Sequence, residues 1–154
     1  MQTINLLKKL NYFDLIIFDL DDTLISLRKY DKLLFQKICD DLIQNKKTKK
    51  ILFKKLIRLR QIEINRFKSL KIFDKFFNKK NRKLAIKIYN SYFPNLFKIE
   101  KKNLNILKIL KKKNKELYLV TNGNINRQSN KIENLKISKY FKRIFILDGK
   151  KKNL

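Results

Sequence analysis

The chain of 154 residues contains no histidine or tryptophan, one cysteine, one proline, two glycines and only 13 acidic residues. The absence of histidine excludes every zinc site that needs an imidazole ligand. A single cysteine, Cys39, excludes an intrachain disulfide framework and is typical of a reducing compartment, where we expect it to pack in a helical core. Because proline and glycine are so scarce, the boundaries of helices and strands rest on apolar periodicity alone.

Long apolar runs are also missing. No stretch approaches the ~20 consecutive apolar residues that a membrane-spanning helix needs. The amino terminus lacks the continuous apolar region of a secretory signal. We therefore expect a cytoplasmic protein with no membrane partner.

Acidic residues are few, and 40 lysines and arginines give a formal net charge of +27. A field of this size attracts polyanions, so a basic nucleic-acid-binding protein is one interpretation. The lysines are, however, spread among many asparagines and isoleucines, with no zinc-finger, RNP or homeodomain pattern to direct them. These three residue types share A- and T-rich codons, and base-composition bias accounts for the charge. We therefore expect no specific nucleic-acid partner.

An acidic turn follows the apolar run Leu15 to Ile17, and it reads Phe18-Asp19-Leu20-Asp21-Asp22-Thr23-Leu24. The run predicts a buried strand with Asp19 and Asp21 at its tip. Carboxylates this close oppose each other's ionisation unless a cation compensates them. An oxygen-only site with room for water and phosphate suits Mg²⁺. The alternative for an isolated Asp-x-Asp is a solvated turn after a strand.

A second apolar run, Glu116 to Val120, predicts another strand and leads directly into Thr121-Asn122-Gly123. Open parallel sheets bind ligands at the carboxyl ends of their strands, so both motifs are expected in one crevice. There the Thr121 hydroxyl and exposed main-chain amides could hold a phosphate. Taken alone, Thr-Asn-Gly is also the sequence of an ordinary turn. The two motifs together are more specific than either one.

The two motifs in this order resemble the haloacid dehalogenase superfamily of phosphohydrolases. The residues that follow the second motif resemble the branch of this superfamily with a helical cap, namely Gln128, Lys131-Ile132, Leu135 and Tyr140-Phe141. The resemblance covers nearly the whole chain. It implies an α/β fold: a Rossmann-like parallel sheet core formed by residues 1–25 and 95–154, with residues 26–94 inserted as an α-helical cap. Apolar residues recur at helical spacing within the insertion and predict three or four helices.

The resemblance also implies a function, which is magnesium-dependent hydrolysis of a phosphomonoester on a small phosphorylated metabolite. Asp19 would be the nucleophile that forms an aspartyl-phosphate. Asp21 would act as general acid and then general base, and its main-chain carbonyl would join Asp19 in holding the metal. Thr121, Asn122 and Gly123 would bind the phosphoryl oxygens. The second aspartate favours ester hydrolysis over dehalogenation, because halide displacement needs no proton donor.

The chain departs from the superfamily pattern after residue 147. A third-motif lysine and fourth-motif acids are expected there, and Lys150, Lys151 and Lys152 stand at a suitable distance but lack the following proline. We interpret them as a solvated charge run, and Asp148 as an acidic turn after Arg143 to Leu147, the next strand outward. The core is then incomplete, and we expect a chain that is poorly stable or self-associating and that has little phosphatase activity. A non-catalytic remnant or one half of a split phosphatase is the third interpretation.

The remaining candidates have structural interpretations. Asp22 and Thr23 are expected to satisfy turn amides. The phenylalanines of the insertion, among them Phe73 and Phe77, are expected to pack between helices. The arginines of the insertion, Arg28, Arg60 and Arg66, are interpreted as ordinary surface residues. The sequence does not indicate an oligomeric state.

Overall fold

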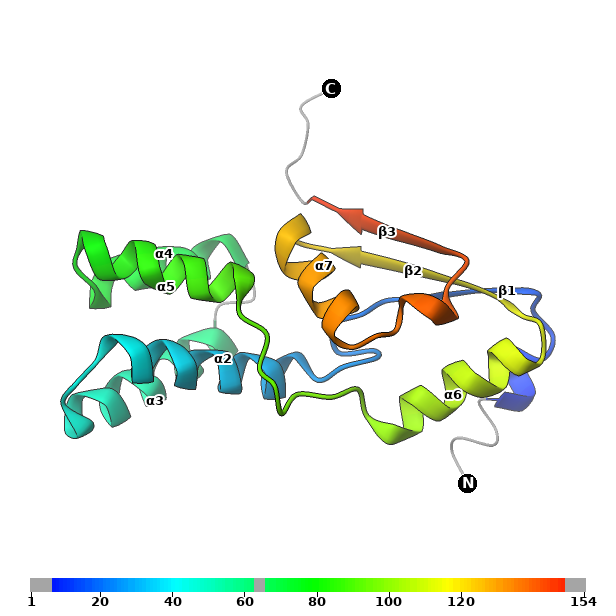
Figure 1. Ribbon diagram of the computed structural model, residues 1–154, viewed down its shortest axis with the longest axis horizontal. Coiled ribbons are helices and arrows are strands. Elements are labelled where there is room, and N and C mark those ends of the chain that lie inside the picture. The colour runs from blue at the N-terminus through cyan, green and yellow to red at the C-terminus, as the bar shows by residue number, and fades with distance from the viewer. Residues whose placement is uncertain (1–6, 63–65, 149–154) are drawn as a thin grey trace. The chain divides into compact units, whose positions relative to one another are not determined.

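The computed structural model describes residues 7–62 and 66–148, and the chain separates into two compact units. One unit combines Met1–Leu27 with Lys98–Leu154 and contains the sheet, while Arg28–Phe97 forms the other and is helical (Figure 1). The division into a hydrolase core at residues 1–25 and 95–154 and a cap at 26–94 stays a prediction. The expected fold class, a parallel α/β sheet with a helical insertion, is confirmed.

The sheet contains three parallel strands in the order β1-β2-β3. Their register places Ile17 opposite Tyr118, and Val120 opposite Phe145. The third strand is therefore the next one outward from the second, as expected. The elements of this unit are β1 (Leu15–Phe18), α6 (Lys101–Lys112), β2 (Glu116–Asn122), α7 (Ile125–Asn134), the 3₁₀ turn η1 (Ser138–Tyr140) and β3 (Arg143–Leu147).

Helices α6 and α7 lie on the same face of the sheet (Figure 1). Crossover connections between parallel strands are right-handed, and the strands here are added in one direction, so both crossover helices reach the same side. Side chains alternate along β2 accordingly, with Leu117 and Leu119 buried and Tyr118 and Val120 only half-buried. Three leucines and isoleucines of α6 supply the helical side of this core, namely Ile106, Leu107 and Leu110.

Strand β1 is less buried than the sequence indicates. Ile16 is buried, but its neighbours Leu15 and Ile17 are 46% and 60% exposed. The expectation of a buried strand is therefore wrong for the part of the chain that the structure describes. The physical reason is that α6 and α7 cover only the face to which Ile16 belongs.

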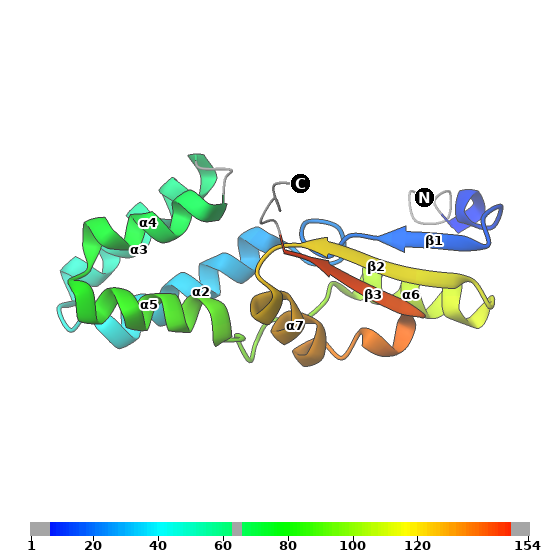
Figure 2. The same ribbon diagram turned by 90° about the horizontal axis from the view of Figure 1, so that it is seen from above.

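The second unit consists of helices (Figure 2). Aromatic side chains pack between them. Phe73 is 1% exposed and meets Tyr89 edge to face, with ring centroids 6.1 Å apart. Phe77 and Cys39 are also buried, so the packing roles expected for Phe73, Phe77 and Cys39 are confirmed. The helices are α2 (Leu27–Leu42), α3 (Lys46–Ile62), α4 (Arg66–Phe76) and α5 (Lys79–Ser91).

Arg60 departs from its interpretation as a surface arginine. Its Nε atom lies 2.6 Å from Oδ2 of Asp31, and the two side chains are only 14% and 2% exposed. The pair joins α3 to α2 inside the helical unit. Among the helices that the structure describes, none is both long and apolar enough to cross a bilayer.

Candidate active site

The two sequence motifs meet at one edge of the sheet. Strands β1 and β2 are adjacent and parallel, with Phe18 opposite Leu119, so both strands end at the same edge. Asp19 follows the last residue of β1 directly, and Thr121 and Asn122 end β2. The geometry therefore brings the aspartate loop beside the Thr-Asn strand end, as the sequence predicts.

Main-chain hydrogen bonds fold the aspartate loop into a compact turn. The amides of Leu24 and Ile25 both donate to the Leu20 carbonyl, at 3.0 and 3.1 Å. Asp22 has a φ of 59°, and its amide donates to the Ile25 carbonyl at 2.7 Å. Aspartate tolerates this left-handed conformation better than most residues.

The Asp22 side chain also has a structural partner. Its Oδ1 accepts a hydrogen bond from the Leu27 amide at 2.9 Å and so satisfies a donor at the start of α2. This contact agrees with the interpretation of Asp22 as a turn residue. Asn103 of α6 adds a brace, because its Nδ2 donates to the carbonyls of Thr23 and Leu24 at 3.0 and 2.9 Å.

Asp21 is held by two side chains of α7. Its Oδ1 lies 2.7 Å from the Lys131 Nζ, and its Oδ2 accepts from the Gln128 Nε2 at 3.0 Å. The side chains of Asp21 and Lys131 are 5% and 1% exposed. A buried carboxylate needs such compensation, because burying an isolated charge is costly.

Gln128 connects the two motifs. The same Nε2 lies 3.2 Å from Oγ1 of Thr121 and 2.9 Å from the Asn122 carbonyl oxygen. Thr121 is buried in β2, whereas Asn122 is exposed. From the sequence, Gln128 and Lys131 are recognised only as part of the family resemblance, with no role of their own. Their spacing could have indicated burial. They stand three residues apart, and so on one side of the helix, next to the apolar Ile132, which is also buried.

Asp19 and Gly123 differ in their surroundings. Asp19 is exposed at the sheet edge. Gly123 has a φ of 144°, a conformation that favours glycine, and its amide donates to the Leu147 carbonyl at 2.9 Å. In this conformation that amide extends the pairing of β2 with β3. The phosphate-binding role of Gly123 stays a prediction.

The residues that would complete the site are only partly described. Asp148 follows β3 directly and is exposed, which places it at the same sheet edge as Asp19. Lys150, Lys151 and Lys152 lie outside the described residues. Within the described residues, no group of three or more acidic, cysteine or histidine side chains is positioned to hold a metal ion.

The residues present nevertheless fit Mg²⁺. This ion prefers oxygen ligands, retains several waters and commonly uses only one or two carboxylates together with substrate phosphate. Asp19 offers an exposed carboxylate, and the main-chain carbonyl of Asp21 stands in the same loop. The Asp21 carboxylate is less suited to the metal, because both of its oxygens already accept hydrogen bonds from α7.

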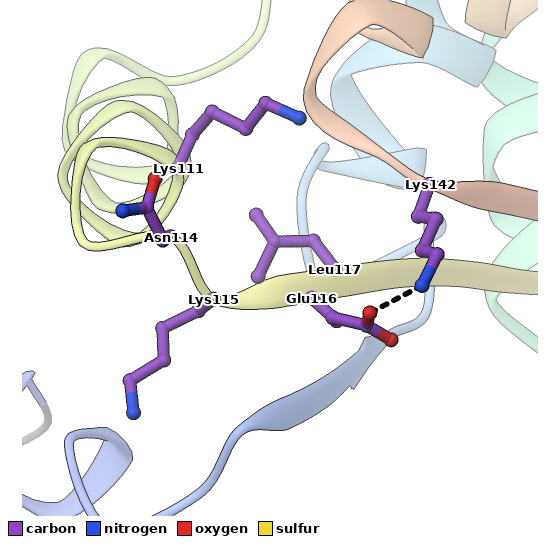
Figure 3. Close-up of a pocket in the computed structure, with 6 residues that line it drawn as sticks. All are labelled: Lys111, Asn114, Lys115, Glu116, Leu117 and Lys142. Atoms are coloured by element: carbon purple, nitrogen blue, oxygen red, sulfur yellow. Dashed lines mark hydrogen bonds and ion pairs between the residues drawn. The ribbon is translucent and has the colours of Figure 1, made fainter.

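A pocket at the other end of β2 does not resemble a catalytic site (Figure 3). Lys142 and Glu116 form an ion pair there, and Lys115 points away from Lys111 and Lys142. The Lys115 Nζ instead donates to the Asn11 carbonyl and to Asp14. The lysines do not converge on a common point, so they do not form an anion-binding cluster. The lining residues are Lys111, Asn114, Lys115, Glu116, Leu117 and Lys142.

Comparison with solved structures shows which proteins share this fold. YfnB of Bacillus subtilis, described as a HAD-hydrolase and bound to magnesium, is 18% identical with a TM-score of 0.58; the match covers 87% of this chain and 63% of YfnB. A Clostridium difficile protein described as a phosphatase is 22% identical with a TM-score of 0.57, and the match covers 88% of this chain and 61% of that one. A Thermotoga maritima protein described as a beta-phosphoglucomutase is 16% identical with a TM-score of 0.59, at 87% and 61% coverage.

At these identities the likeness establishes the fold, and the chain spans roughly three fifths of the length of the proteins it matches, 61% to 63%. Among curated protein sequences, none matches the chain at a significant level. The sequence profile of one family, haloacid dehalogenase-like hydrolase, matches residues 16–153, which is nearly the whole chain and includes both motifs of the site. The chain therefore belongs to the haloacid dehalogenase-like hydrolase family.

Proposed function

We propose that this chain carries the phosphate-transfer site of a magnesium-dependent phosphomonoester hydrolase that acts on a small phosphorylated metabolite through an aspartyl-phosphate intermediate. The observation that supports this proposal best is the meeting of the two strand ends. Asp19 and Asp21 follow β1, Thr121 and Asn122 end β2, and Gln128 contacts Asp21, Thr121 and Asn122. A nucleophile, a proton-transfer group and phosphate donors thus share one edge of the sheet.

The roles proposed for the two aspartates come from the family resemblance. Asp19 is exposed and follows the end of β1, so its carboxylate oxygen can attack phosphorus in line with the ester oxygen. The new Asp19 oxygen–phosphorus bond forms as the ester phosphorus–oxygen bond breaks. Asp21 in its protonated form gives a proton to the leaving alkoxide, and the resulting carboxylate then takes a proton from the water that cleaves the aspartyl-phosphate and releases inorganic phosphate.

Thr121 and the exposed amide of Asn122 hold the phosphoryl oxygens while these bonds change. The carboxylate of Asp19 and the main-chain carbonyl of Asp21 would hold Mg²⁺, which when bound offsets the repulsion between an anionic nucleophile and an anionic ester. The family description and the oxygen ligands at the sheet edge support this arrangement.

The decisive experiment is hydrolysis of p-nitrophenyl phosphate by the purified chain with and without Mg²⁺. We expect a low rate of turnover that requires the metal and that falls to the background rate in Asp19→Asn, because the amide keeps the shape but removes the nucleophile. The matched control is Asp14→Asn, since Asp14 is exposed in the same unit and precedes β1. Turnover that survives Asp19→Asn or chelation by EDTA would contradict the proposal.

A further inference from the structure

Two buried polar residues of α7, Gln128 and Lys131, have no role in the chemistry just described. Gln128 is 1% exposed and Lys131 is also 1% exposed. A helix buries such side chains only where their polar atoms find partners, because an unpaired buried donor loses its hydration without compensation. Their partners are the aspartate loop and the end of β2.

We propose that Gln128 and Lys131 are positioning residues, which fix the carboxylate of Asp21 and turn the hydroxyl of Thr121 toward the phosphate. This inference rests on the proposed function, because it gives these two groups their purpose. It concerns residues outside the two motifs from which the function was inferred.

The contact with Thr121 determines which way its hydroxyl proton points. Gln128 Nε2 carries two hydrogens for three acceptors, and the Thr121 Oγ1 at 3.2 Å is the most distant of them, so it shares a hydrogen with a nearer acceptor. A hydroxyl that accepts through one lone pair keeps its own proton for donation elsewhere. A phosphoryl oxygen at the sheet edge is an acceptor suited to that proton. Because Gln128 Nε2 cannot accept a hydrogen bond, the Thr121 proton points away from it and is available to the substrate.

The side-chain orientation of Gln128 is itself fixed by its neighbours. Asp21 Oδ2, Thr121 Oγ1 and the Asn122 carbonyl oxygen all surround the same nitrogen. The opposite orientation would place the amide oxygen of Gln128 against a carboxylate and a carbonyl, both of which are acceptors only. The amide oxygen instead lies buried without a hydrogen-bond partner. This orientation leaves the amide oxygen without a hydrogen bond, which costs stability, while the amide nitrogen contacts both motifs.

Lys131 fixes the other oxygen of Asp21. Its Nζ lies 2.7 Å from Oδ1, while Gln128 reaches Oδ2, so the carboxylate is held at both oxygens. Two anchors on one rigid helix define the rotation of the carboxylate about its own axis. A carboxylate offers about four lone-pair directions, so these two bonds do not exhaust its capacity for proton transfer. Proton transfer requires the correct distance to the leaving oxygen, which is what this support supplies.

The test compares two substrates that differ in leaving group, phenyl phosphate and p-nitrophenyl phosphate. Phenolate is the poorer leaving group and depends more on the proton from Asp21. We expect Gln128→Leu and Lys131→Met to lower the ratio of kcat for phenyl phosphate to kcat for p-nitrophenyl phosphate by about tenfold. A merely structural role would reduce the active fraction of protein and leave this ratio unchanged.

Two further measurements separate the residues. Inorganic phosphate, used as a competitive inhibitor, should bind about tenfold more weakly to Gln128→Leu, because Thr121 loses its orientation. Lys131→Met should weaken phosphate binding less, since the Lys131 Nζ lies 2.7 Å from Asp21 Oδ1 whereas Gln128 is the residue in contact with the Thr121 hydroxyl. Lys131→Arg keeps the cation and should retain the substrate ratio of the unchanged chain.

Matched controls are Asn126→Leu on the exposed side of α7 and Lys108→Met on the exposed side of α6. Both should leave the ratio and the phosphate affinity unchanged. If Lys131→Met fails to fold, Gln128→Leu decides the question. A reduced activity with an unchanged ratio in Gln128→Leu would overturn the positioning role while the proposed function stands. Turnover that survives Asp19→Asn would overturn the proposed function, and the positioning role with it.

Discussion

The guanidinium Nε of Arg60 lies 2.6 Å from the carboxylate Oδ2 of Asp31, and these two largely buried side chains join α3 to α2 in the helical unit. A buried ion pair is not in itself strongly stabilising, because both charges lose their hydration. Removing one partner is different, since the other charge remains buried without compensation. This asymmetry makes the pair a sensitive point of the helical unit.

Arg60→Met should lower the free energy of unfolding by about 3 kcal/mol, because it removes a cation that lies 2.6 Å from a carboxylate only 2% exposed. Urea unfolding followed by far-UV circular dichroism measures this change. Arg58→Met is the matched control, since Arg58 is exposed on the same helix, and it should change stability by less than about 0.5 kcal/mol. The double substitution Asp31→Leu with Arg60→Met should recover most of the loss. A stability loss no larger than that of the control would contradict this account.

Asp22 and Asp21 are neighbours in sequence with different expected sensitivities. Asp22→Val should cost about 2 kcal/mol, because it loses the bond to the Leu27 amide and places a β-branched residue at a φ of 59°. Asp22→Asn keeps both features and should retain stability and turnover. Asp21→Asn should lose turnover and also lower stability, because it removes the anion that lies 2.7 Å from the buried Lys131 ammonium. Thermal unfolding and p-nitrophenyl phosphate hydrolysis, measured on the three variants together, distinguish a turn residue from a catalytic one.

Cys39 should be chemically inert in the folded protein. Burial raises the pKa of its thiol to about 11, and the neighbouring Asp40 carboxylate adds to the effect. At pH 8 the reactive thiolate is therefore scarce and also inaccessible. Reaction with Ellman's reagent should be slow in the native chain and fast in urea. Rapid reaction of the native chain would place this thiol at the surface.

The same shift has a consequence for stability. The folded-state pKa of Cys39 lies above the ordinary thiol value of 9.0, so between about pH 9 and about pH 11 the unfolded chain loses the thiol proton more readily. Stability due to this group is complete below pH 9 and falls as the pH rises through that window. Cys39→Ala should remove this part of the alkaline decline, which urea titrations at several pH values would measure.

The sequence predicts the meeting of Asp19 and Asp21 with Thr121 because one rule suffices: parallel strands end at a common edge. The long helices of the insertion are equally legible from their apolar periodicity. The hydrogen bond between Lys131 and Asp21 cannot be predicted from the sequence, because those residues are 110 positions apart and their contact depends on how a crossover helix packs on the sheet. The burial of Arg60 could not be predicted for another reason, since nothing distinguishes one arginine in a chain with 40 basic residues.

The exposure of Ile17 was also beyond sequence reasoning. A run of three apolar residues is the same whether one face or both faces of the strand are covered. Only the direction in which strands are added determines which face the helices cover. In the described residues that direction is constant, so one face of the sheet carries α6 and α7, and the opposite face carries no crossover helix.

This uncovered face predicts how the 154-residue chain behaves in solution. Leu15, Ile17, Phe145 and Leu147 are 46%, 60%, 42% and 53% exposed, and the strand register places them on one side with Tyr118 and Val120. We call these six residues the open face. Parallel sheets normally have both faces covered, and contiguous apolar patches of this kind drive association. The chain should therefore self-associate, and the associated fraction should rise with its concentration.

Substitutions on the open face should reduce that association without weakening the strands. Threonine keeps the β-branched shape that strands favour while adding a hydroxyl, so Ile17→Thr combined with Phe145→Thr should shift the chain toward monomer. Leu96→Thr is the matched control, because Leu96 is 85% exposed in the helical unit and should leave association unchanged. Light scattering coupled to size-exclusion chromatography over a concentration series measures the mass directly. A chain that stays monomeric at its highest attainable concentration, or a double variant that associates as strongly as the control, would show that the open face does not govern assembly.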